Sequence, residues 1–182
     1  VIKNYSGDVM NFEMAKDMLD FEDIQCELIK VSDDVASAPK GEEYKRRGVA
    51  GIFFAYKIAG AAASEGKDLS EVVEVTNKAL ESVRTMGVAL SSCIIPEVGK
   101  PTFEIADDEM EIGMGIHGEP GIRRGKLQTA DEIVDEMIAP IIDDIPYESG
   151  DEVAVLINGL GATPLEEQYV MYRRVHQVLE EK

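Results

Sequence analysis

The 182-residue sequence contains no tryptophan, and aromatic residues make up only 6% of it. This scarcity argues against functions that stack aromatic rings on bases. The two cysteines, Cys26 and Cys93, lie far apart and form no Cys-x-x-Cys pair, so neither a disulfide framework nor a structural zinc site is expected. A reducing cytoplasm fits this use of cysteine. No apolar run approaches the length of about 18 residues that a transmembrane helix needs.

Basic residues are also scarce. The chain has 18 Lys and Arg against 36 Asp and Glu, which gives a net charge of −18. Nucleic-acid binding needs clustered basic residues, and anionic membranes repel an acidic chain, so neither partner is expected. The tight basic clusters Lys45-Arg46-Arg47 and Arg173-Arg174 are expected on solvated surfaces. Apolar residues make up 45% of the chain, which is enough for the core of one large domain or two small ones.

Strand-like and helix-like patterns alternate along the chain, which predicts an α/β architecture with mixed sheets flanked by helices. Strands are predicted at 24–31, 88–95, 102–105, 110–116 and 153–157, the third pairing with the fourth. Helices are predicted at 9–19, 51–63, 69–86, 130–143 and from 165 onward, the last three opened by capping boxes at Asp68, Thr129 and Thr163, with Pro140 kinking or ending the fourth. The polar segment 32–48 is expected to be an exposed loop. A division near 84–88 separates two α/β subdomains, 1–86 and 87–182.

Both ends of the chain resemble interrupted elements. Val1-Ile2-Lys3 has the pattern of a strand end, so no signal peptide is expected there. Glu180-Glu181-Lys182 closes a helical pattern without a capping glycine. We therefore expect the chain to be an internal segment of a longer protein.

The strand predicted at 110–116 runs directly into His117, which glycines flank on the far side. Glycine lets a loop fold closely around a small ligand. An imidazole at a strand end in such a loop is a candidate nucleophile, base or ligand. The alternative is a loop histidine that only hydrogen-bonds a neighbouring carbonyl. The other histidine, His176, borders an apolar stripe and is expected to pack there.

A second candidate site lies in Lys3-Asn4-Tyr5-Ser6-Gly7-Asp8, just before the first predicted helix. Asp8 is a good N-cap residue, and capping is the structural explanation for it. A cap does not exclude catalysis, because open α/β sheets place ligands at their strand-to-helix turns.

The glycine-rich segment Asn158-Gly159-Leu160-Gly161-Ala162-Thr163 lies between a predicted strand and a predicted helix. Such a loop can hold a phosphate on its backbone amides, which makes a nucleotide-binding protein a third hypothesis. The segment matches neither the GxxxxGK[ST] nor the GxGxxG pattern, and tight turn chemistry explains it equally.

The chain resembles the dihydroxyacetone-binding subunit, or K domain, of dihydroxyacetone kinase. The matching pieces occur in family order along nearly the whole chain. They are Lys3-Asn4-Tyr5-Ser6-Gly7-Asp8, Gly48-Val49-Ala50-Gly51, Lys57-Ile58-Ala59-Gly60-Ala61-Ala62-Ala63, Gly99-Lys100-Pro101-Thr102-Phe103-Glu104, Gly115-Ile116-His117-Gly118-Glu119-Pro120-Gly121 and Asn158-Gly159-Leu160-Gly161-Ala162-Thr163.

The resemblance implies a two-subdomain K-domain fold and a cytoplasmic phosphotransferase, with dihydroxyacetone held on His117 as a covalent hemiaminal. It implies that Lys3 contacts the substrate and that Asp8 is both a substrate contact and the catalytic base. It also implies that this chain binds no cofactor and no metal. The phosphoryl donor would be ATP with magnesium, or a phosphohistidine protein, on a nucleotide-binding L-type subunit or domain, and the subunit would form a homodimer.

One family motif, GSGHEP, would lie before Lys3 and is absent from this sequence. That motif supplies a further substrate-binding histidine. The resemblance therefore leaves two functions open: a kinase subunit, or a dihydroxyacetone-sensing relative that acts as a transcriptional coregulator. We expect the isolated segment to be inactive.

Overall fold

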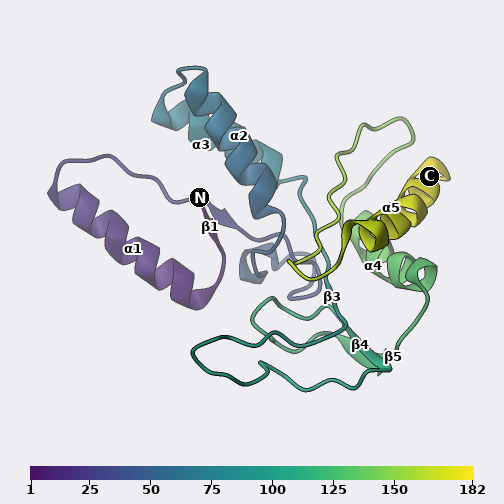
Figure 1. Ribbon diagram of the computed structural model, residues 1–182. Helices are drawn as coiled ribbons and strands as arrows, with labels where there is room; N and C mark the ends of the chain where they lie inside the picture. The colour runs from purple at the N-terminus through teal and green to yellow at the C-terminus, as the bar shows by residue number, and fades with distance from the viewer. The chain divides into compact units, whose positions relative to one another are not determined.

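A computed structural model describes residues 1–182, and the chain divides into two compact units, Val1–Thr85 and Met86–Lys182. Each unit is described by itself. The elements, most of which Figure 1 labels, are, in order, β1 (Ile2–Lys3), α1 (Ser6–Phe21), β2 (Lys30–Val31), the 3-10 helix η1 (Glu43–Lys45), α2 (Ile52–Ser64), α3 (Leu69–Leu80), β3 (Val88–Ala89), β4 (Glu109–Ile112), β5 (Arg123–Lys126), α4 (Ala130–Asp144) and α5 (Leu165–Glu180). This mixture of helices and small sheets confirms the predicted α/β class.

The first unit begins with a β-α-β arrangement. Strands β1 and β2 are parallel, with Ile2 opposite Lys30, and α1 connects them. Helix α1 begins three residues earlier than predicted, after the extended residue Tyr5, and no side chain caps it. The predicted cap at Asp8 is therefore wrong: Asp8 lies inside the first turn. A carboxylate there still interacts favourably with the positive end of the helix.

Helices α2 and α3 pack against each other, as Figure 1 shows. The buried residues of α2 are Ala55 and Ala62, whose small side chains allow a close approach. The capping box at the start of α3 is confirmed, with Asp68 and Glu71 each accepting a backbone hydrogen bond from the other. Helix α3 ends at Leu80, earlier than the predicted Met86.

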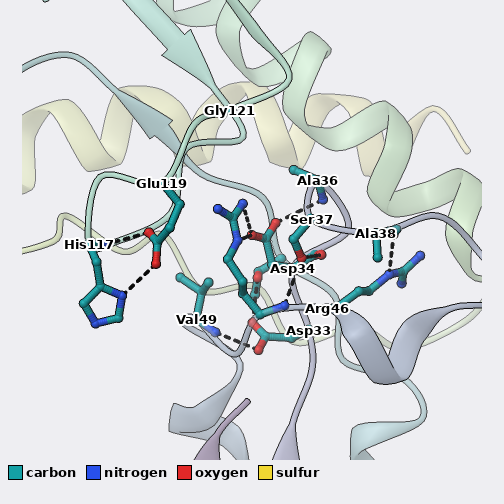
Figure 2. Close-up of polar contacts among 12 residues, drawn as sticks. Asp33, Asp34, Ala36, Ser37, Ala38, Arg46, Val49, His117, Glu119 and Gly121 are labelled. Carbon is teal, nitrogen blue, oxygen red and sulfur yellow. Dashed lines mark hydrogen bonds and ion pairs between the residues drawn. The ribbon is translucent and has the colours of Figure 1, made fainter. Parts of the chain in front are cut away.

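The polar segment 32–48 is not the exposed loop that its composition predicts. Asp33, Asp34 and Arg46 are all at most 2% exposed. The Asp33 carboxylate accepts hydrogen bonds from the backbone N–H groups of Val49 and Gly51, both at 2.9 Å, and Figure 2 shows the bond from Val49. Because these hydrogen bonds replace those that water would make, a carboxylate side chain can be buried without a prohibitive desolvation cost.

The basic cluster at 45–47 is a solvated surface only in part: Lys45 is exposed, as predicted, whereas Arg46 is buried and Arg47 is largely covered. Arg46 Nε donates to the Ala38 carbonyl at 2.9 Å, and Arg47 Nη2 lies 2.7 Å from Asp34 Oδ2. Burial raises the pKa of the Asp34 carboxyl above its ordinary value, and this effect exceeds the opposing attraction of Arg47. Within the cluster, Arg47 pairs with the buried Asp34, Arg46 holds the loop backbone at Ala38, and Lys45 pairs with Glu42 at the surface.

The second unit contains an antiparallel sheet in the order β3-β4-β5. Val88 lies opposite Ile112 in one pair, and Ile112 lies opposite Arg123 in the other. The predicted pairing of 102–105 with 110–116 is wrong, because β3 and β5 occupy both edges of β4. The predicted strand 88–95 is shortened to β3, with one further bridge between Ile94 and Pro101.

The core of the second unit gathers around β4. Met110, Ile112 and Ile133 form a buried cluster, and Met137 of α4 and Met171 of α5 pack against it. The predicted capping box of α4, formed by Thr129 and Glu132, is confirmed. The helix continues through Pro140 to Asp144 rather than ending there.

Three predictions near the C-terminus are wrong. The apolar run 153–157 forms no strand and is largely exposed. Pro164, not Thr163, is the N-cap of α5, and no side chain bonds to that helix end. The His176 side chain is 60% exposed and stacks on Tyr172 with ring centroids 6.5 Å apart. Apolar spacing alone cannot tell whether another element covers a segment. Along the whole chain, none of the helices combines the length and hydrophobicity that crossing a bilayer requires.

Candidate functional site

Lys3 and Asp8 come together at the end of β1 in the first unit. The chain leaves the strand at Lys3, turns, and enters α1, which brings Lys3 Nζ within 3.5 Å of Asp8 Oδ2. Both side chains remain partly exposed, Lys3 at 26% and Asp8 at 33%. Asp8 Oδ2 is itself buried and accepts no hydrogen bond. The Lys3 ammonium is the partner of this oxygen, so the two side chains form an ion pair at the end of β1.

Asn4 fixes the turn between these two residues. Its side-chain amide donates to the carbonyls of Tyr44 and Arg46 at 2.9 and 2.7 Å, and its own N–H donates to the Val31 carbonyl at 2.9 Å. Its carbonyl accepts from Gly48 N–H at 3.2 Å. The turn is therefore held from three sides.

Gly48 lies directly against this turn. A Cβ atom at position 48 would be 2.3 Å from the Val31 oxygen and 2.7 Å from the Asn4 nitrogen. Both neighbours are backbone atoms of the paired strands or their ends, and they cannot move independently. Only glycine allows this close approach.

His117 lies in the second unit, in a loop that follows β4. The strand ends at Ile112, so the prediction that His117 directly follows a strand is wrong, although its place in a glycine-rich loop holds. The loop closes on itself through bonds from Gly115 N–H to the Glu119 carbonyl and from Gly118 N–H to the Gly115 carbonyl, both 3.0 Å. Gly118 has φ of 88°, a conformation that favours glycine.

Glu119 orients the His117 ring, as Figure 2 shows. One carboxylate oxygen lies 3.0 Å from His117 Nδ1, and the other accepts the His117 backbone N–H at 3.0 Å. Burial raises the pKa of Glu119, but hydrogen bonds from the backbone and from His117 outweigh it and hold that pKa below its ordinary value. Glu119 is therefore ionised at neutral pH.

An ionised carboxylate can only accept, so it selects the imidazole form that carries its proton on Nδ1. The ring lone pair is then on Nε2. Because the side chain is 41% exposed, a small molecule in solvent can reach the ring. The geometry thus favours a nucleophilic imidazole. Sequence reasoning named His117 but missed Glu119, whose signal is a carboxylate two residues after a histidine in a turn.

The segment 158–163 uses its amides internally. Leu160 N–H donates to Asn158 Oδ1 at 3.0 Å, and the N–H groups of Ala162 and Thr163 donate to the Gly159 carbonyl at 3.2 and 3.0 Å. Three of the backbone amides in this segment are therefore engaged within it, which supports tight turn chemistry. No group of three or more His, Cys, Asp or Glu side chains is placed to hold a metal ion.

The chain is similar to known proteins along its whole length. The Dak1 domain family matches residues 1–182. The chain is 49% identical over 179 residues to the dihydroxyacetone-binding subunit of PTS-dependent dihydroxyacetone kinase 1 from Listeria innocua, covering 98% of this chain and 54% of that protein. It is 45% identical over 183 residues to the L-erythrulose kinase of Pectobacterium atrosepticum, covering 98% of this chain and 31% of the kinase.

The chain is also similar to a solved structure. The dihydroxyacetone kinase operon co-activator Dha-DhaQ superposes with a TM-score of 0.88 at 32% identity, covering 98% of this chain and 55% of the co-activator. The chain spans about half the length of the Listeria subunit and of this co-activator. The resemblance drawn from the motifs is confirmed, and the chain belongs to the Dak1 domain family.

Proposed function

We propose that the intact protein binds dihydroxyacetone as a hemiaminal on His117 and presents it for phosphorylation to dihydroxyacetone phosphate. The observation that carries this proposal is the contact of Glu119 with His117 Nδ1. A covalent link suits so small a substrate, since dihydroxyacetone offers little surface for binding by contact alone. Glycerol has no carbonyl group and is excluded by chemistry.

In the proposed step, the Nε2 lone pair of His117 attacks the ketone carbon and forms a C–N bond. The electrons of the carbonyl π bond move to the oxygen, which takes a proton from solvent. The ring becomes positively charged during the attack, and the Glu119 carboxylate stabilises that charge and then accepts the Nδ1 proton. Glu119, whose pKa lies below its ordinary value, returns this proton to solvent, so the product is a neutral hemiaminal beside an ionised Glu119, and atoms and charge balance.

Asp8 is the proposed general base for phosphoryl transfer. The Asp8 carboxylate is 33% exposed, and it would accept the proton of a substrate hydroxyl as that group attacks phosphorus; its oxygen nearest to Lys3 is Oδ2. Lys3, 3.5 Å from the same oxygen, would donate hydrogen bonds to the substrate and help to position it.

The donor and the assembly are also part of the proposal. We infer that the phosphoryl group comes from a partner subunit or domain that carries ATP with magnesium or a phosphohistidine. The PTS-dependent relative favours the second source. We expect a cytoplasmic homodimer. Because a relative is an L-erythrulose kinase, the substrate class extends to short ketoses with a hydroxymethyl group beside the carbonyl.

The second candidate is a sensor that forms the same hemiaminal and acts on a transcription factor. The TM-score of 0.88 to an operon co-activator favours it. Both candidates bind the ketone, and only the kinase passes phosphate to it. Turnover with a phosphoryl-donor subunit separates them: adduct formation without any turnover would favour the sensor.

The test of the shared step uses dihydroxyacetone labelled with carbon-13 at the carbonyl. In the intact protein the ketone resonance should be replaced by that of a tetrahedral carbon, and the His117→Ala variant should lose this signal. His176→Ala is the matched control, since it removes the other histidine from an exposed position. A tetrahedral signal that survives in His117→Ala would overturn the proposal.

A further inference from the structure

Glu111 is a buried carboxylate in the middle of the sheet in the second unit. It lies on β4, and only 6% of the residue is exposed. Its neighbours Met110 and Ile112 are also buried, so both faces of β4 are covered. Burying a carboxylate is costly unless hydrogen bonds or an opposite charge compensate it. The hydrogen-bond and ion-pair partners of Glu111 therefore indicate its structural role.

One partner lies at the end of the loop that carries His117. Glu111 Oε1 accepts the backbone N–H of Gly121 at 2.6 Å. The chain at Gly121 lies so close to β4 that a Cβ atom there would be 2.2 Å from the Ile112 oxygen and 2.9 Å from the Met114 nitrogen. The loop 113–121 therefore leaves β4 and returns to it, and Glu111 bonds the returning end.

The other partner is Arg124 of β5. Its Nε and Nη2 lie 2.8 and 2.6 Å from Glu111 Oε2. This two-point contact fixes the carboxylate in one orientation. Burial raises the pKa of Glu111, but the bonds from Gly121 and Arg124 outweigh it and keep that pKa below its ordinary value. The carboxylate is thus ionised and held rigidly at neutral pH.

We infer that Glu111 is a positioning residue for His117: by bonding Gly121 it fixes the end of the loop 113–121 and so keeps Glu119 against the His117 ring. This inference rests on the proposed function for its effect on the adduct. Its structural consequence, the orientation of the ring, does not depend on that function. Glu119 lies two residues before Gly121. Loss of the hydrogen bond between Glu111 and Gly121 would therefore directly affect the position of Glu119.

The experiment compares Glu111→Gln with the wild type in the intact protein. Glutamine keeps the size of the side chain, but its uncharged amide cannot accept from both Gly121 and Arg124 as the carboxylate does. The nitrogen-15 resonances of His117 report the tautomer without any ligand. We expect the proton on Nδ1 in the wild type and a shift toward Nε2, the form that free histidine prefers, in Glu111→Gln. Occupancy of the dihydroxyacetone adduct should fall by about 10-fold to 100-fold, as when a supporting group is lost.

Glu136→Gln is the matched control. Glu136 also bonds an arginine of β5, Arg123, but lies on α4, and its bonds go to Arg123 and Gln128 rather than to the loop 113–121. The tautomer and the adduct should be unchanged in this variant. If Glu111→Gln does not fold, Glu111→Asp takes its place, since it keeps the charge on a shorter side chain that cannot reach both partners. The tautomer of His117 and the occupancy of the adduct should then change in the same direction but by less.

A folded Glu111→Gln protein with the wild-type tautomer and wild-type adduct would overturn the inference. A wild-type protein that forms no adduct would instead overturn the proposed function. The tautomer measurement would still decide whether Glu111 positions the ring.

Discussion

The Glu119 carboxylate bonds His117 at two atoms, the ring Nδ1 and the backbone N–H, each at 3.0 Å. Through Glu119, the His117 ring is linked to the His117 main chain, so the ring is oriented before any ligand arrives. An imidazole oriented in advance has less rotational freedom to lose on reaction. The following predictions rest on this contact and on the geometry around it.

Glu119→Gln should weaken the adduct by roughly 10-fold, because glutamine can accept from Nδ1 but carries no charge to stabilise the cationic ring. Glu119→Ala should weaken it further, since the ring then loses its orienting group as well. Titration of the tetrahedral carbon-13 signal with dihydroxyacetone measures both. Equal occupancy in all three proteins would mean that the contact has no role in the reaction.

Asp8→Asn should leave the adduct intact while phosphoryl transfer falls by about 10²–10⁴-fold, the usual contribution of a general base. Because the Asp8 side chain caps no backbone group, asparagine should change the stability only slightly. The experiment measures turnover with the donor subunit and compares it with the occupancy of the adduct. The control is Asp17→Asn, at an exposed position of the same helix, which should keep full turnover. Wild-type turnover in Asp8→Asn would remove Asp8 from the chemistry.

Gly48→Ala should destabilise the first unit by about 1–3 kcal/mol, the usual cost of forcing extra atoms into a packed site. The methyl group would lie 2.3 Å from the Val31 oxygen. Gly60→Ala is the opposite case, because nothing lies within 4 Å of that Cβ position and α2 would gain about 0.5–1 kcal/mol of stability. Urea unfolding compares the two. A neutral Gly48→Ala would mean that the strand ends move apart easily.

The pH dependence of stability should show the lowered pKa of Glu111. A carboxyl with a pKa below its unfolded value, for which 4.5 is the reference, stabilises the fold above that value and loses its contribution as the pH falls through the folded pKa. Asp34 works in the opposite direction, since its raised pKa favours the protonated folded state in acid and this contribution is lost as the pH rises. Urea midpoints between about pH 3 and pH 7 should fall less steeply in Glu111→Gln than in the wild type. Parallel curves would contradict the contacts assigned to Glu111.

Local rules in the sequence predicted local structure well. The capping boxes at Asp68 and Thr129 form as expected, because each needs only residues three positions apart. Lys3 and Asp8 were predicted in one segment, and the short turn between β1 and α1 brings them together. The roles of Lys3, Asp8 and His117 in the reaction remain predictions.

Contacts between distant residues could not be predicted. The burial of Asp33 depends on the backbone of Val49 and Gly51, and no spacing rule connects these positions. Strand β5 is polar along its length, and pairing with β4 alone makes it a strand. The role of Glu111 depends on the return of the chain at Gly121, which a one-dimensional pattern does not contain.

Helix α5 has a further consequence for the second unit. It has no buried residue, and exposed ion pairs from Arg173 and Arg174 to α4 join the two helices. Such pairs weaken as salt screens them, so α5 should open locally before the rest of the unit unfolds. Met171 of this helix covers the cluster that contains Met110 of β4, the strand that anchors the His117 loop. Ionic strength should therefore change, through the local opening of α5, how rigidly β4 holds the His117 loop.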